Sequence, residues 1–160
     1  MKTKILNLIF PVFFVLYISC SVDENAQNCL ETSVTMVVNG EMQTFEANAY
    51  GVDLNGNQGY TLQINLYRGS NNPFREQGIV ILLPYKKTGE NVIKNFNYHQ
   101  YINGVAFNGD FINGEFQSKV ITNSNSCFYA TFSGKLNDGN QEVIITDGKV
   151  SYQYETPFDD

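Results

Sequence analysis

The chain contains no tryptophan, one histidine and three cysteines, and its ten basic residues are outnumbered by sixteen acidic ones. Without tryptophan, it lacks the largest aromatic side chain for stacking on a flat ligand. It has no set of two cysteines and two histidines for a zinc site, and no G-x-S-x-G or H-E-x-x-H motif. The sequence therefore predicts neither a metal site nor a cofactor, and no local catalytic pattern.

A long hydrophobic run is also missing. The apolar stretch from Ile5 to Ile18 has fourteen residues and is interrupted by Asn7 and Pro11, whereas a membrane-spanning helix needs about 20 apolar residues. A short basic segment, residues 1–4, precedes it. This combination is typical of a secretory signal sequence.

The stretch ends in Leu16-Tyr17-Ile18-Ser19-Cys20, and a small residue followed by cysteine at this point resembles the lipobox of bacterial lipoproteins. The resemblance implies a signal peptide over 1–19, lipid on the Cys20 thiol, and a flexible polar tether over 20–31. Asp23 and Glu24 resemble the export signal of Bacteroidota surface lipoproteins. Because a solvated tether is also acidic, a surface or periplasm-facing orientation at the outer membrane stays open.

Removing residues 1–19 takes away Lys2 and Lys4, which leaves eight of the ten basic residues against sixteen acidic ones, a net charge of −8. A surface of this sign repels nucleic acid and anionic lipid headgroups, so we expect no nucleic-acid partner. The remaining 141 residues suffice for one domain with a sizeable core.

Two cysteines, Cys29 and Cys127, are left once Cys20 carries lipid. Thiols in an oxidising compartment usually pair, so we predict a structural disulfide. The alternative is a reactive thiol, but neither cysteine lies in a C-x-x-C motif or near the histidine.

From Ser33 onward the apolar runs are short, rich in β-branched and aromatic residues, and separated by Asn, Asp and Gly. No window repeats with the period of a helix. We therefore predict an all-β domain over 32–156 and a C-terminal tail over 157–160. The fold expected is a single antiparallel β-sandwich or small β-barrel of about 8–10 strands.

Two hairpins are predicted in register. Asn39-Gly40 suits a type I′ turn, which pairs Val34 with Phe45 and Val37 with Met42. Asp147-Gly148 is expected to form the second turn, between strands 143–146 and 149–154. That turn places five apolar side chains on one face: Val143, Ile145, Val150, Tyr152 and Tyr154.

Two stretches between these hairpins carry further expectations. The unbroken apolar run from Ile79 to Leu83 predicts a strand buried on both faces. The other is Val105 to Val120: Asn-Gly occurs at 103, 108 and 113, a spacing of five residues. We interpret that region as closely spaced turns or bulges that feed two strands.

The C-terminal region contains Phe132-Ser133-Gly134 and Ile145-Thr146-Asp147-Gly148. It is similar to the C-terminal half of small Bacteroidota lipoprotein domains, in which an F-S-G strand precedes an I-T-D-G hairpin. The resemblance implies a β fold. No activity is established for that family, so it implies no function.

Polar and aromatic side chains alternate with apolar ones along two predicted strands, and the polar set should face outward together. A glycan or peptide could bind there through amides and aromatic rings. The candidate ligand-binding residues are Gln63, Asn65, Tyr67, Asn97, His99 and Tyr101.

Two other readings of polar residues are weaker. His99 has no neighbouring nucleophile or orienting group in the sequence, so an ordinary surface histidine is the simpler interpretation. Residues 53–59 resemble a calcium loop in their alternating oxygen ligands, but Gln58 replaces the glycine that the loop needs and Ile64 replaces the closing glutamate. A polar loop is the better interpretation.

The sequence thus predicts a lipid-anchored envelope protein that binds a glycan or an envelope protein and is not an enzyme. A structural accessory of an envelope assembly is one alternative. A hydrolase whose acid–base pair comes from distant strands is the other.

The lipid anchor is tested by protease treatment of intact cells that carry a C-terminally tagged copy, beside a Cys20→Ala copy. We expect the two copies to differ, because the variant cannot receive lipid. Loss of the wild-type tag from intact cells would indicate a surface orientation, and survival until the outer membrane is permeabilised a periplasm-facing one. Identical behaviour of the two copies would contradict the anchor.

Overall fold

The computed structural model describes residues 29–53, 61–68, 75–102 and 104–158, and within these it is all-β. The predicted signal peptide, Cys20 and most of the tether lie outside the described residues. The strands are β1 (Ser33–Val38), β2 (Glu41–Asp53), β3 (Thr61–Arg68), β4 (Arg75–Pro84), β5 (Gly89–Glu90), β6 (Asn95–Ile102), β7 (Val105–Asn123), β8 (Cys127–Asn137) and β9 (Glu142–Gln153). No helix in the described part of the chain is long and apolar enough to cross a membrane.

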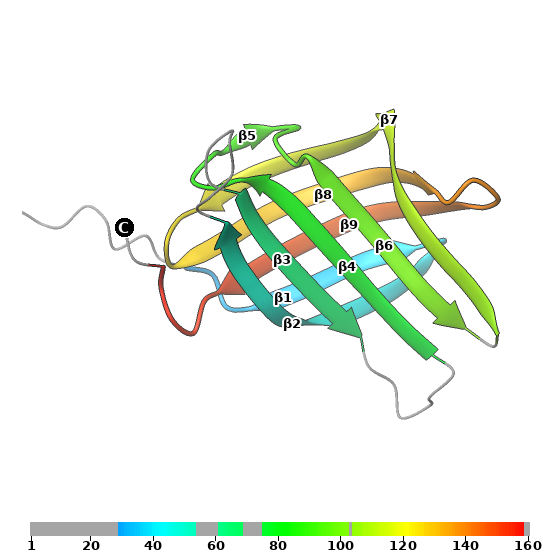
Figure 1. The fold of residues 1–160 in the computed structure, drawn as a ribbon, viewed down its shortest axis with the longest axis horizontal. Coiled ribbons are helices and arrows are strands. Elements are labelled where there is room, and N and C mark those ends of the chain that lie inside the picture. Colours follow the sequence, from blue (N-terminus) through cyan, green and yellow to red (C-terminus); the bar gives the residue numbers. More distant parts are fainter. Residues whose placement is uncertain (1–28, 54–60, 69–74, 103, 159–160) are drawn as a thin grey trace, which may run out of the picture.

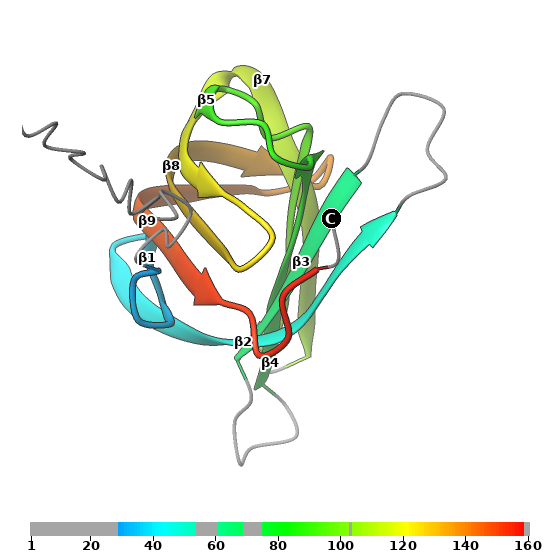
Figure 2. The ribbon, with the colours of Figure 1, turned by 90° about the vertical axis from the view of Figure 1, so that its left-hand side faces the viewer.

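Eight of the strands close into an antiparallel barrel (Figures 1 and 2). The order around the barrel is β7-β6-β4-β3-β2-β1-β9-β8, and the pairing of β8 with β7 closes the ring. The short β5 pairs with β7 beside this ring. The expected fold class is confirmed, and the barrel form of it is the one observed.

The barrel interior is filled by side chains, as is usual for eight strands. Each long strand points alternate residues inward, and buried examples include Met36, Ile64, Phe96, Phe128 and Ile145. Fully burying a side chain of this size stabilises a fold by about 1.5–3 kcal/mol. The interior is therefore a packed core.

The first predicted hairpin is confirmed. Val34 lies opposite Phe45 and Val37 opposite Met42, and Asn39 and Gly40 have φ angles of 49° and 88°, as a type I′ turn requires. The Asn39 side-chain oxygen also accepts a hydrogen bond of 2.8 Å from the backbone N–H of Ile144. The turn is thereby attached to β9.

The second predicted hairpin is wrong. β9 runs without a break through Asp147-Gly148, and these residues form a β-bulge at which three residue steps on β9 match two on β8. Asp147 has a φ of 51°, which provides the kink. The expected face is nevertheless correct, because the five predicted apolar side chains from Val143 to Tyr154 are all buried.

Ser151 is an exception on that strand. The two-residue period of the strand predicts that it faces outward with Lys149 and Gln153, yet only 2 % of it is exposed. Its hydroxyl donates a 3.2 Å hydrogen bond to the carbonyl of Leu30. The segment that precedes β1 therefore covers Ser151 from outside.

Two further expectations are corrected by barrel closure. The run from Ile79 to Leu83 on β4 is fully buried on its inward face only, since Val80 and Leu82 face outward and are half-buried. The region from Val105 to Asn123 is one strand instead of two, with register breaks between Phe111 and Phe116 and again after Val120. Predicted bulges are thus present there, but the chain does not turn back.

The barrel has two different ends. We call the end that carries Asn39-Gly40, Gly104 and residues 138–141 the hairpin end. The opposite end, which carries Cys29, residues 85–94 and the last described residues, is called the terminal end (Figure 1).

The aromatic rings of Tyr50, Tyr154 and Phe158 close the terminal end. Tyr50 stacks on Tyr154 with centroids 4.5 Å apart, and the Phe158 ring meets both edge-on. The Tyr50 hydroxyl accepts from the N–H of Thr156 at 3.0 Å and donates to its carbonyl at 2.9 Å. These contacts fix the chain after β9 against β2.

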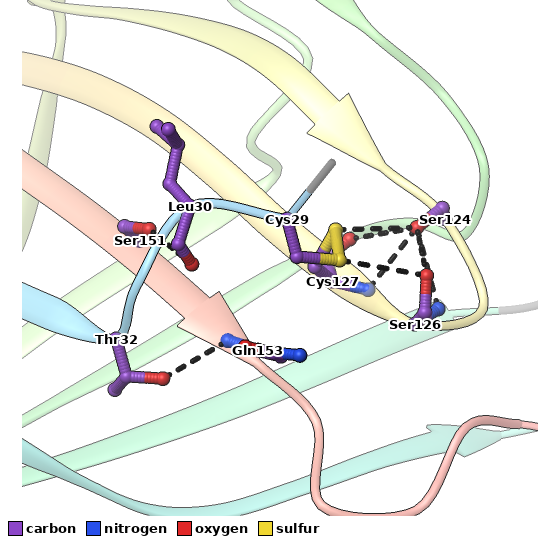
Figure 3. The surroundings of a disulfide bond; sticks show 8 residues. All are labelled: Cys29, Leu30, Thr32, Ser124, Ser126, Cys127, Ser151 and Gln153. Carbon is purple, nitrogen blue, oxygen red and sulfur yellow. Dashed lines mark hydrogen bonds between the residues drawn. A yellow bond between two sulfur atoms is a disulfide. The ribbon is translucent and has the colours of Figure 1, made fainter. Parts of the chain in front are cut away.

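The predicted disulfide is present between Cys29 and Cys127, whose Cα atoms are 5.8 Å apart (Figure 3). The hydroxyl oxygen of Ser124 accepts from the N–H of Cys127 at 3.1 Å, and Thr32 accepts from the N–H of Gln153 at 3.1 Å. The disulfide thus fastens the segment before β1 to the start of β8.

Reducing the disulfide should lower the free energy of unfolding by about 2–5 kcal/mol, because it closes a loop of about 100 residues in the unfolded chain. Urea unfolding followed by circular dichroism, with and without dithiothreitol, measures the change. A Cys29→Ser/Cys127→Ser variant should match the reduced protein and not respond to dithiothreitol. Equal stability of oxidised and reduced wild type would contradict this role.

Candidate ligand-binding site

The six candidate residues lie on one outward face, on two strands that flank β4. Across the sheet, Asn65 on β3 aligns with Val80 on β4, and Val80 aligns with Asn97 on β6. Gln63, Tyr67, His99 and Tyr101 are exposed, and Asn65 and Asn97 are half-buried. The outward orientation is therefore confirmed, although β4 separates the two groups.

The aromatic part of the face is built around Gly78. This residue lies between Tyr67 and His99 in the register, and a Cβ atom at position 78 would overlap the His99 imidazole. The imidazole therefore lies over the glycine and toward β3. Tyr67 and Tyr101 are 36 % and 40 % exposed, so these tyrosines and His99 present three rings on one face.

The amide part of the face is held by hydrogen bonds between neighbouring side chains. The Gln63 amide donates to Asn65 Oδ1 at 3.1 Å. The Asn97 amide donates to Asn108 Oδ1 at 2.9 Å and to Asp110 Oδ1 at 3.2 Å. Within the described ranges, Asn65 Nδ2 and Asn97 Oδ1 form no hydrogen bond, so a donor and an acceptor remain for a ligand.

A hollow of about 530 Å³ adjoins the amides. Gly51 on β2 lies opposite Gln63, and a Cβ at Gly51 would meet no atom within 4 Å. The missing side chain thus leaves space over β2. The hollow is lined by Tyr50, Gly51, Val52, Asp53, Thr61, Gln63, Asn65 and Leu82.

The charge of this face is negative. Glu76 lies opposite Tyr101, Asp110 opposite Asn97, and Asp53 lines the hollow. An anionic ligand would be repelled by these carboxylates. The face is therefore suited to an uncharged ligand with hydroxyl groups.

A second polar group lies inside the barrel, near the hairpin end. Arg68 Nη1 donates to Gln77 Oε1 at 3.2 Å, and Gln77 Nε2 donates to the Tyr98 hydroxyl at 2.8 Å. The Tyr98 hydroxyl in turn donates to Gln100 Oε1 at 2.9 Å. Burial raises the pKa of Tyr98 to about 12, and the hydrogen bond from Gln77 offsets part of the rise.

Sequence reasoning missed this interior group, although a signal was present. Arg68, Gln77 and Gln100 occupy positions that continue the inward-facing sets of β3, β4 and β6. A polar residue at an inward-facing position of a strand is buried and needs a hydrogen-bonding partner. Two of the three hydrogen bonds, from Arg68 to Gln77 and from Gln77 to Tyr98, join neighbouring strands, so these pairs could not be located before the strand order was known.

The described residues add no ligand to a metal site and no hydrogen-bond partner to His99. No group of three or more histidine, cysteine, aspartate or glutamate side chains in the described segments could hold a metal ion. Residues 54–59 of the candidate calcium loop lie outside the described residues. His99 forms no hydrogen bond with any side chain that the structure describes.

Comparisons of the chain with protein families, curated proteins and solved structures gave no match.

The interior group makes stability depend on pH. The raised pKa of Tyr98 favours the protonated hydroxyl in the folded state, so its contribution is complete below pH 10 and is lost as the pH rises toward 12. Two pKa units correspond to about 2–3 kcal/mol. A Tyr98→Phe variant should lose correspondingly less stability than wild type over this range in urea unfolding. Parallel pH profiles for the two proteins would contradict the assignment.

Proposed function

We propose that the protein is a non-catalytic binding module, held at the bacterial envelope by lipid on Cys20, and that it binds an uncharged glycan on the outward face of β3, β4 and β6. The observation that carries the proposal is the combination of three exposed rings, available amide groups and an adjoining hollow on that face. The glycan face is defined as the six candidate residues and the hollow over Gly51.

The geometry fits the chemistry of a sugar. A sugar ring has an apolar face, which packs on an aromatic ring, and hydroxyl groups at its edge, which bond to amides. On the glycan face the rings of Tyr67, His99 and Tyr101 would pack on the sugar ring. The amides of Asn65 and Asn97 would form hydrogen bonds with its hydroxyl groups. The nearby carboxylates favour neutral sugars over acidic ones.

The anchor proposal is supported by the disulfide, since such bonds persist in oxidising compartments outside the cytoplasm. Nine residue steps separate Cys20 from Cys29, so the tether reaches at most about 30 Å. Cys29 is attached at the terminal end of the barrel. Lipid on Cys20 would therefore keep the terminal end nearest the membrane.

A second candidate function is contact with an envelope protein. Met42 and Ile144 are 64 % and 49 % exposed on the outward side near the hairpin end. Exposed apolar side chains of this size are candidates for a protein interface. This alternative predicts that Met42→Asp or Ile144→Asp removes a co-purifying protein while glycan binding is absent.

Filling the hollow tests the glycan face without disturbing the fold. Gly51→Val adds a side chain into open space and should leave stability unchanged or raise it by up to about 1 kcal/mol. Affinity electrophoresis through gels that contain a β-glucan, a xylan, a galactomannan or an α-glucan should detect binding by wild type. Gly51→Val, Tyr67→Ala and Tyr101→Ala should each weaken it by about tenfold.

Tyr129→Ala is the matched control, because Tyr129 lies on β8, which is not part of the glycan face. It should bind like wild type. Equal retardation of Gly51→Val, Tyr67→Ala and wild type would contradict the glycan face. Absence of retardation of wild type by all four polysaccharides would contradict the proposed ligand class among common neutral glycans.

A further inference from the structure

The wall of the barrel opens where the pairing of β7 with β6 ends. Residues 105–110 of β7 pair with β6, and the ladder ends where Asn97 meets Asp110. Asp110 and Phe111 also pair with β8, and after a break in the register residues 116–123 pair with β8 again. Between Phe111 and Phe116 the register is broken, and Figure 1 shows β7 bending sharply between its two halves.

A cavity of about 440 Å³ occupies this opening, which is within the size range of small-molecule sites. The apolar residues that line it are Ile93, Phe111 and Phe116. The Phe111 and Phe116 rings are stacked, with centroids 5.2 Å apart, and the Phe116 ring packs on Phe96 in the core at 5.0 Å. The rings at the opening are only half-buried, so an entering apolar group would cover them.

The polar lining carries one sign of charge. Among the lining residues, Lys94 is the single charged side chain, and the others that are polar are Asn91, Asn113, Gln117 and Ser118. Lys94 is exposed and makes no ion pair with any described residue. A cation beside an apolar floor is complementary to a molecule with an anionic group attached to an apolar one.

We propose that this opening is a second binding site, separate from the glycan face, for a small amphipathic anion. The apolar part of the ligand, a planar aromatic or a short acyl group, lies against Phe111 and Phe116. Its carboxylate, sulfonate or phosphate group lies beside Lys94. The opening involves β7 and the chain before β6, whereas the glycan face has its hollow over β2 and β3, so the two proposals stand independently.

The test uses two fluorescent probes that share an aromatic ring system and differ in charge. One is the anion 1-anilinonaphthalene-8-sulfonate, and the other is the uncharged N-phenyl-1-naphthylamine. The chain contains no tryptophan, so emission from the bound probe is not mixed with tryptophan emission. Wild type should bind both probes saturably at one site per chain.

The first variant changes the charge at the rim. Lys94→Glu should weaken binding of the anionic probe by at least about tenfold, because an attraction becomes a repulsion at close range. It should change binding of the uncharged probe less than about twofold, since the apolar floor is unaltered. Lys87→Glu is the matched control: this exposed lysine on the same connection is not part of the lining and should bind both probes like wild type.

The second variant changes the floor. Phe111→Leu keeps an apolar side chain but removes a ring. It should weaken the binding of both probes by about threefold to tenfold. Thermal unfolding of each variant establishes that it is folded. Non-saturable binding by wild type would overturn the proposal. So would equal effects of Lys94→Glu and Lys87→Glu on the anionic probe, or unchanged binding of both probes by folded Phe111→Leu.

Discussion

Closure of the sheet through the pairing of β7 with β8 is the constraint on which the rest of the structure depends. An open sheet of these strands would leave two edges with unpaired backbone groups, and closure removes them. It also gives every strand one inward and one outward face, which is why Val80 and Leu82 on β4 are half-buried while Ile81 between them is fully buried. The proposed glycan face lies on this outward side of β3, β4 and β6, where Tyr67, His99 and Tyr101 are exposed.

A barrel of eight strands has a narrow interior, and the chain fits bulky rings into it by placing glycines beside them, either opposite on the next strand or two residues away on the same strand. A Cβ at Gly148 would overlap the Phe132 ring, and a Cβ at Gly109 would lie 2.8 Å from Phe107 Cε1. Bulges then bend the strands enough to close the ring. The bulge at Asp147-Gly148 does both: it bends β9, and its glycine leaves room for the Phe132 ring.

The two ends of the barrel are closed by different chemistry. At the terminal end, the rings of Tyr50, Tyr154 and Phe158 and the disulfide hold the first and last described residues against the strands. Toward the hairpin end, the hydrogen-bonded chain from Arg68 to Gln100 satisfies polar groups inside the barrel. A satisfied network of this kind is costly to break, because each lost partner leaves a buried polar group without a bond. The strands that carry the face between the two ends are thus joined by side-chain hydrogen bonds as well as by backbone pairing.

The sequence by itself determined the strand content, the Asn39-Gly40 turn with its register, the pairing of Cys29 with Cys127, and the face on which each candidate residue lies. All of these except the disulfide follow from local rules, namely the two-residue period of a strand and the φ preferences of turn residues. Only the tertiary structure decided that Asp147-Gly148 is a bulge, because a two-residue turn and a one-residue bulge both return Ile145 and Val150 to the same face. It also decided which strands are neighbours, and hence that Gly78 separates Tyr67 from His99 and that Gln77 reaches Tyr98. Those contacts join residues from different strands, and no local pattern specifies the order of strands around a closed barrel.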